Sequence, residues 1–140
     1  MAISELGPNV DISIFPAHET MMASTGDDST YVGRIVCMNV DEEVCFPTAI
    51  SDIPCGILIE GNVTGGYVTY RAFGVVPVKM NDVVAVPNCI AITNLGGVID
   101  GRAGTAISTC HIVGQILEHS DAENDIVTCI VNCISPSIKV

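Results

Sequence analysis

Two stretches of this 140-residue chain, TAISDIPCGILIE (residues 48–60) and TAISTCHIVGQILE (residues 105–118), present nearly the same order of residues. The match continues past the glutamate that ends each stretch, because a polar turn and a second apolar run follow both. With one residue inserted in the second stretch, the run 67–73 falls on 125–131. Each unit is typical of a β-hairpin. We therefore predict two related hairpins that lie across a pseudo-two-fold axis and close a barrel.

Strand signals also dominate the rest of the chain. Short runs rich in Val and Ile are bounded by Gly, Pro, Asn and Asp, and no window keeps an apolar 3.6-residue period over several turns. The sequence therefore predicts an all-β fold, either a small β-barrel or a sandwich. The predicted strands are 33–40, 55–61, 66–74, 74–80, 82–87, 89–93, 104–109, 111–120 and 125–134.

The composition predicts an aliphatic core and a partly covered surface. Hydrophobic residues make up 49% of the chain and aromatic residues only 4%, so Val, Ile, Leu, Ala and Cys must form the core. Charged residues make up only 15%, which favours a chain that covers much of its surface with copies of itself or with a partner.

The charge balance disfavours several partners. Five basic residues stand against 16 acidic ones, which gives a formal charge of −11. We therefore predict no direct nucleic-acid partner and no binding to an anionic membrane, because both need clustered Lys and Arg. No apolar run is long enough to span a bilayer, and the first residues lack the features of a secretory signal, which predicts a cytoplasmic protein.

Seven cysteines are an odd number for a disulfide framework, and they occur without a secretory signal. Most lie in apolar, strand-like runs, so we predict buried reduced thiols, with one or two disulfides as the alternative.

The group most open to a metal-binding interpretation is Cys110 and His111 with Cys129 and Cys133. Cys129 and Cys133 are about 13 Å apart along an extended strand, which is too far for one zinc ion. Cys110 and His111 are adjacent and point to opposite faces of a strand, which prevents them from acting as a nucleophile and its base. The sequence motifs of hydrolases, phosphate loops and zinc proteases are missing. We therefore predict that the protein is not an enzyme, with no catalytic, cofactor-binding or metal-binding residues and no cofactor.

The first 30 residues lie outside the repeat and predict an N-terminal arm, either a disordered terminus or a segment that adds a strand to a neighbouring subunit. The β-barrel domain is predicted over residues 31–140, with repeat units at about 33–79 and 84–134. Apolar residues in a polar arm need a surface on which to bury. We predict that Ile12, Ile14 and Phe15 contact a partner.

The layout of residues 33–134 resembles the capsid decoration proteins, also called cement proteins, of tailed bacteriophages. A Gly-bounded strand opens the domain, and a Gly-Ile-Leu strand follows a short polar turn. GVVPV (residues 74–78) matches the family's G-V-x-P-V strand. A loop after Gly-Gly leads to VGQIL and Glu (residues 113–118), which matches the V-G-x-[IL]-L-E strand, and a closing apolar strand follows.

This resemblance implies a small β-barrel or tulip-like domain that clusters, often as a homotrimer, on the outside of an icosahedral phage head. The partner would be the major capsid protein, whose neighbouring subunits the domain braces against the internal pressure of the genome. The N-terminal arm would reach across the capsid surface. The resemblance also implies a virion location after assembly in the host cytoplasm, which agrees with cysteines in a chain without a secretory signal.

Two other interpretations remain open at the level of sequence. One is a small β-barrel enzyme or ligand-binding module with its site in the barrel mouth, near the loop 94–104. The other is a different virion β-protein, such as a tail-tube or fibre subunit, whose acidic balance would suit a conduit for DNA.

Overall fold

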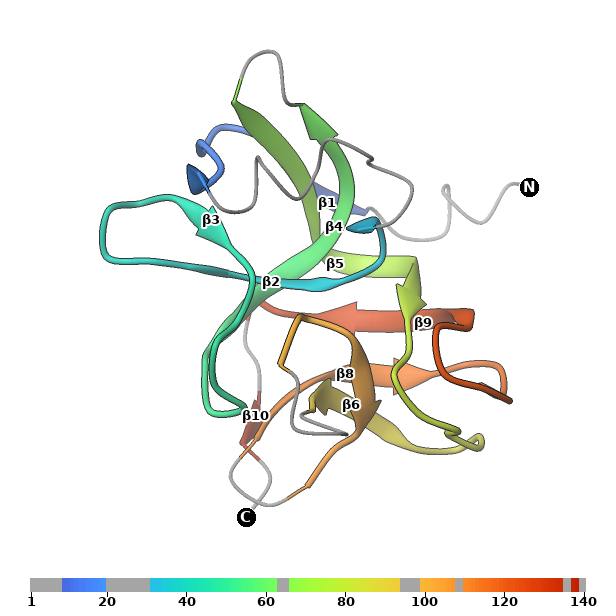
Figure 1. The fold of residues 1–140 in the computed structure, drawn as a ribbon. Coiled ribbons are helices and arrows are strands. Elements are labelled where there is room, and N and C mark those ends of the chain that lie inside the picture. The colour runs from blue at the N-terminus through green and yellow to red at the C-terminus, as the bar shows by residue number, and fades with distance from the viewer. Residues whose placement is uncertain are drawn as a thin grey trace, which may run out of the picture.

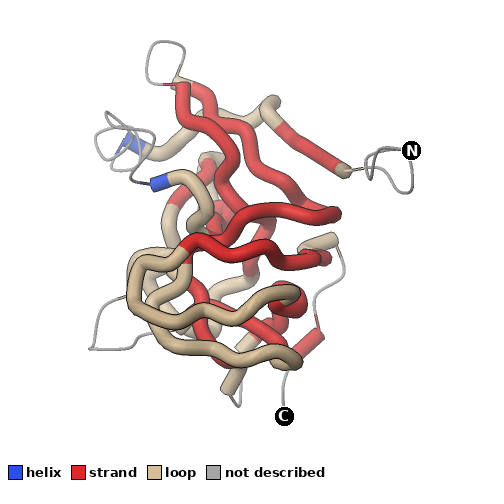
Figure 2. Tube along the Cα trace, turned by 90° about the vertical axis from the view of Figure 1, so that its right-hand side faces the viewer, coloured by secondary structure: helices blue, strands red, loops and turns tan. Residues whose placement is uncertain are grey.

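The computed structural model describes residues 9–19, 31–62, 66–93, 99–107, 110–134 and 137–138. The described residues form ten β-strands that join in one antiparallel sheet (Figure 1). The sheet is open and strongly curled, so that it forms a half-barrel, and a quarter turn of the molecule shows the strands following one another around the curl (Figure 2). The structure confirms the predicted all-β fold class.

The path across the sheet is β3-β2-β4-β5-β9-β8-β6-β7, while β1 pairs with β5 and β10 pairs with β8. The bounds are β1 Val10–Ile12, β2 Ile35–Met38, β3 Val44–Cys45, β4 Pro54–Asn62, β5 Tyr67–Lys79, β6 Cys89–Ile92, β7 Ala103–Thr105, β8 His111–Ile116, β9 Ile126–Asn132 and β10 Ser137–Ile138.

Three of the predicted strands do not form as separate strands in the structure. The runs 66–74 and 74–80 form one continuous strand, β5, because Gly74 takes a positive φ of 128° and lets the strand bend without ending. The run 82–87 is not a strand, and within it only Val84 makes a bridge, to Ser120. The short strands β1, β3 and β10 were not predicted.

The strand order is palindromic when β2, β3, β4 and β5 are matched to β6, β7, β8 and β9. Gly56 of β4 pairs with Val36 of β2, and Gly114 of β8 pairs with Ile90 of β6. A register shift follows at the next residue of β2 and of β6. The two glycines of the repeated sequence therefore occupy equivalent places in two halves of the sheet.

The second strand of each unit shows that the alignment read from the sequence is wrong by one residue. Leu58 pairs with Tyr70, and the equivalent pair in the second half is Ile116 with Cys129. Tyr70 is therefore equivalent to Cys129, whereas the sequence alignment placed it on Thr128. The chain from Ile116 to Cys129 is one residue longer than the chain from Leu58 to Tyr70, and a shift of one residue moves every side chain of a strand to the other face.

With the corrected match, Phe73 of β5 is equivalent to Asn132 of β9. These two residues pair directly with each other. The pseudo-two-fold axis between the halves therefore passes through this pair, in the middle of the sheet.

Each half has its own apolar core. The core of the first half contains Leu58 and Tyr70, and its partly buried neighbours Ile12 and Phe15 come from the N-terminal segment. The equivalent core of the second half contains Ile116 and Cys129. It is closed by residues from the opposite face of the first half, which are Ile35, Cys37 and Ile57.

The described part of the N-terminal segment is not a free arm, which corrects the interpretation of residues 1–30 for residues 9–19. β1 pairs with β5 of the same chain, and Asp11 forms an ion pair with Arg71 in which Oδ1 and Nε are 2.8 Å apart. Ala17 is buried and bridges to Val44 of β3. The segment is held against the rest of the chain because its apolar side chains cover the core of the first half. Residues 1–8 and 20–30 of the predicted arm lie outside the described residues.

The substitution Ala17→Asp tests this role. Ala17 is only 5% exposed, so a carboxylate there would lose its hydration or force the segment off the core, and we expect the free energy of unfolding to fall by about 2–3 kcal/mol. The matched control is Ile14→Asp, because Ile14 is 76% exposed and should tolerate the charge to within about 0.5 kcal/mol. Urea unfolding followed by circular dichroism measures both, and equal stabilities of the two variants would contradict the assignment of Ala17 to the core.

Candidate partner-binding face

An apolar surface covers the convex side of the second half. β9 alternates strictly, so that Val127, Cys129 and Val131 point into the core while the residues between them point outward. The outward side chains of β5 and of the end of β8 continue this surface. We call it the outer face, and it consists of Phe73, Val75, Pro77, Leu117, Ile126 and Ile130.

Strand pairing joins Val75 and Ile130 directly within the outer face, and the outward Thr128 of β9 lies between Ile130 and Ile126. Ile130 stands between two neighbours in the ladder, Val75 of β5 and Gln115 of β8. Directly paired residues of an antiparallel sheet have their Cβ atoms about 5 Å apart, which brings such side chains into contact. Leu117 joins the same surface because its amide donates a hydrogen bond of 2.9 Å to the carbonyl oxygen of Thr128.

The outer face is open to solvent. Ile126 is 54% exposed, Leu117 47%, Ile130 42% and Phe73 36%. Scattered exposed apolar residues are normal on a protein surface, but a contiguous group on one sheet face is typical of a binding surface.

The first half of the chain offers an internal comparison for this face. Ile57 pairs with Arg71, and the equivalent pair of the second half is Gln115 with Ile130. The place of the exposed Ile130 is therefore taken in the first half by Arg71, which is satisfied by its ion pair with Asp11. The fold accepts a polar residue at this outward position, so folding alone does not require an isoleucine there.

Acidic residues border one end of the outer face, at the turn between β8 and β9 and the loop beside it. Glu118 accepts a hydrogen bond of 2.6 Å from the amide of Thr128, which fixes its carboxylate next to β9. Asp82 accepts a hydrogen bond from the amide of Val83. The Ser120 hydroxyl donates to the carbonyl oxygen of Asp82 and holds the loop to the turn. We call Asp82, Glu118 and Asp121 the acidic rim.

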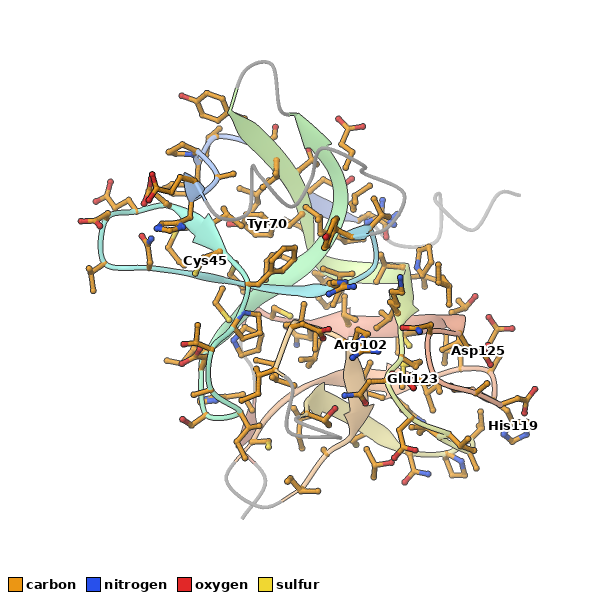
Figure 3. All side chains as sticks on the ribbon, viewed as in Figure 1. Cys45, Tyr70, Arg102, His119, Glu123 and Asp125 are labelled. Carbon is orange, nitrogen blue, oxygen red and sulfur yellow. The ribbon has the colours of Figure 1, made fainter. Side chains whose placement is uncertain are left out.

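The same turn carries further polar groups that serve the fold. The carboxylate of Asp125 accepts hydrogen bonds from two amides of the turn. Figure 3 places Glu123 between Asp125 and Arg102, and the Nη1 of Arg102 lies 2.8 Å from the Oε1 of Glu123. His119 accepts a hydrogen bond at Nδ1 from the amide of Val86. None of the three rim carboxylates forms an ion pair within the described ranges.

The arginine side chains, in contrast, form ion pairs at other places in the chain. Arg34 and Arg102 both form ion pairs with Asp100, where β2 and β7 begin. Burial alone would raise the pKa of Asp100, but hydrogen bonds from Arg102 and the charge of Arg34 hold it below its ordinary value. Arg34, Arg71 and Arg102 are thus each held in an ion pair within the chain. The ion pairs of the described residues include none of the three carboxylates of the acidic rim.

The three predicted contact residues do not form one surface. Ile12 and Phe15 are half-buried and pack against the core of the first half. Ile14 is exposed, and of the three it remains the one that is free to contact a partner. The outer face was not identified from the sequence, because its residues lie in runs that are apolar on both sides.

The cysteines are free thiols, and the structure brings four of them near one another around β2, β3 and β4. Burial raises the pKa of Cys55, Cys129 and Cys133 to about 12. Cys110 and Cys129 are both buried, whereas Cys89 is exposed. In the described ranges, no three His, Cys, Asp or Glu side chains could share a metal ion.

Among the described residues, one hollow lies away from the loop 94–104, near which the barrel mouth was predicted. It has a volume of about 690 Å³, lies beside the β2–β3 hairpin, and is lined by Cys45, Phe46 and Asp52 among others. Its Asp52 carboxylate is already bonded to the amides of Thr48 and Ala49. Residues 94–98 of the predicted loop 94–104 lie outside the described residues.

No family model matches the sequence, and a search of curated proteins finds no match either. In the described part of the chain, no helix is both long and apolar enough to cross a membrane.

Proposed function

We propose that this protein is a non-enzymatic structural component of a virion that binds the outer surface of a tailed-bacteriophage capsid. In this role it stabilises the contacts between major capsid protein subunits. The observation that carries the proposal is the outer face, an apolar sheet surface that is exposed among the described residues. The resemblance of residues 33–134 to capsid decoration proteins supplies the identity of the partner.

Further features support a bracing role. The chain has few charges and an aliphatic core in two interlocked halves, which suits a rigid module. Several copies on one shell, as in the homotrimer that the resemblance implies, would bind with avidity. The protein would be assembled in the host cytoplasm and would remain on the virion.

The test is to mix the purified protein with empty shells of the major capsid protein encoded in the same genome. We expect the protein to sediment with the shells through a sucrose gradient and to raise the temperature at which the shells break open. Sedimentation of the protein with purified tail tubes instead would favour the tail-tube alternative. Failure to bind shells at micromolar concentration would refute the proposed function.

A further inference from the structure

We propose that the outer face docks on a protein surface that is apolar at its centre and basic along one side, where Lys or Arg residues of the partner face the acidic rim. The proposal rests on the proposed function, since it takes the major capsid protein as the partner, and it specifies the chemistry of the contact. It also assigns the orientation of the docked chain, because the acidic rim lies at one end of the outer face.

The apolar centre follows from the internal comparison between the two halves. Ile130 is exposed in the second half, while the equivalent outward position of the first half holds Arg71; the position equivalent to Ile126 holds Tyr67, which is also exposed. Arg71 shows that this fold can hold a polar side chain at that outward position. The apolar side chains of the second half therefore serve a contact outside the chain.

The basic side of the partner follows from charge complementarity. The acidic rim holds three carboxylates beside the exposed Leu117 and Ile126, and the ion pairs of the described residues do not include them. Hydrogen bonds to backbone amides fix Glu118 and Asp82 in place, so these carboxylates lose little freedom when a cation approaches. Fixed charges at the edge of an apolar contact steer association and set its orientation.

A second copy of this chain is a poor occupant of this face. It would carry the same net charge of −11, and its Arg34, Arg71 and Arg102 are each already held in an ion pair within the chain. The acidic rim of one copy would be repelled by the negative charge of the other copy. A homotrimer would therefore have to form through another surface, which leaves the outer face to the shell.

The test measures association of the protein with immobilised empty shells at 50 mM and 500 mM salt. The rim variant is Asp82→Asn, Glu118→Gln and Asp121→Asn, which keeps the acceptor oxygens and removes the charges. We expect its association rate to be about tenfold lower than that of the wild type at low salt and equal to it at high salt. The apolar variant Ile130→Asn should weaken binding at least about tenfold at both salt concentrations.

Matched controls come from the β2–β3 hairpin. Asp41→Asn, Glu42→Gln and Glu43→Gln change the net charge by the same amount at a distant tip, and Val40→Asn changes a side chain that is 98% exposed. Both controls should bind as the wild type does. If the wild type binds, and neither the rim variant nor Ile130→Asn weakens binding more than these controls do, the inference is wrong but the proposed function stands. Absence of any wild-type binding would overturn the proposed function and the inference together.

Discussion

The substitution Gly114→Ala is expected to lower the free energy of unfolding by about 3–4 kcal/mol. Gly114 lies at the crossing of β6, β8 and β9, and a Cβ atom added there would overlap the carbonyl oxygen of Ile130 and the Cα of Val131. Both obstacles are backbone atoms of β9, which cannot move away without breaking the ladder to β5. The strands must therefore separate, and urea unfolding followed by circular dichroism measures the loss.

The equivalent glycine provides a second test. A Cβ atom at Gly56 would overlap the ring of Tyr70 and approach the carbonyl oxygen of Arg71 to 2.7 Å, so Gly56→Ala should cost a similar amount. The control is Gln115→Ala, because Gln115 is exposed next to Gly114 and should change stability by less than about 0.5 kcal/mol. If the free energy of unfolding of the Gly114→Ala protein lies within about 1 kcal/mol of the wild-type value, the substitution behaves like an ordinary surface substitution. That result would show that the strands do not approach each other this closely.

Raising the pH from 8 to 10 is expected to lower the free energy of unfolding by about 4 kcal/mol. Burial raises the pKa of Cys55, Cys129 and Cys133 to about 12 and also raises that of Cys37, from an ordinary value of 9.0. Above pH 9.0 the unfolded thiols lose protons that the folded protein keeps. The stabilisation is therefore complete below that pH and is lost as the pH rises, by about 1 kcal/mol for each thiol at pH 10.

Cysteine variants separate this effect from other alkaline effects. Cys129→Ala should reduce the fall in stability between pH 8 and 10 by about 1 kcal/mol, although it also removes core volume at both pH values. Cys89→Ala should leave the fall unchanged, because Cys89 is exposed. Urea unfolding under a phosphine reductant keeps the thiols reduced. Equal stability of the wild type at pH 8 and pH 10 would show that the thiols are accessible to water in the folded state.

The sequence predicted the all-β class and the two hairpins because these depend on local signals. β-branched runs bounded by turn residues appear wherever a strand forms, and the glycines at positions 56 and 114 mark equivalent places. The register of the second strand could not be predicted, since the runs 67–73 and 125–131 are apolar at nearly every position. Strand pairing rather than local pattern decides which residues of such a run face the core.

The outer face could not be predicted from the sequence for the same reason. The residues of β9 alternate between core and solvent, yet both sets include isoleucine or valine, so no alternation of polarity marks the exposed side. Which side is covered depends on how the first half packs on the second. The N-terminal segment was misjudged because its polar composition suggested a free arm, whereas a few contacts made by Asp11 and Ala17 are enough to fix it.

The pair of Phe73 with Asn132 on the pseudo-two-fold axis has a consequence for how such a chain can arise. The contacts between β5 and β9 are those that two identical four-stranded units would make across a dimer interface. Duplication and fusion of a gene for one unit would turn that encounter between molecules into an encounter within one chain, at an effective concentration in the millimolar range. Once fused, the two units can diverge, so that one keeps a covering segment over its core and the other presents isoleucines to a partner.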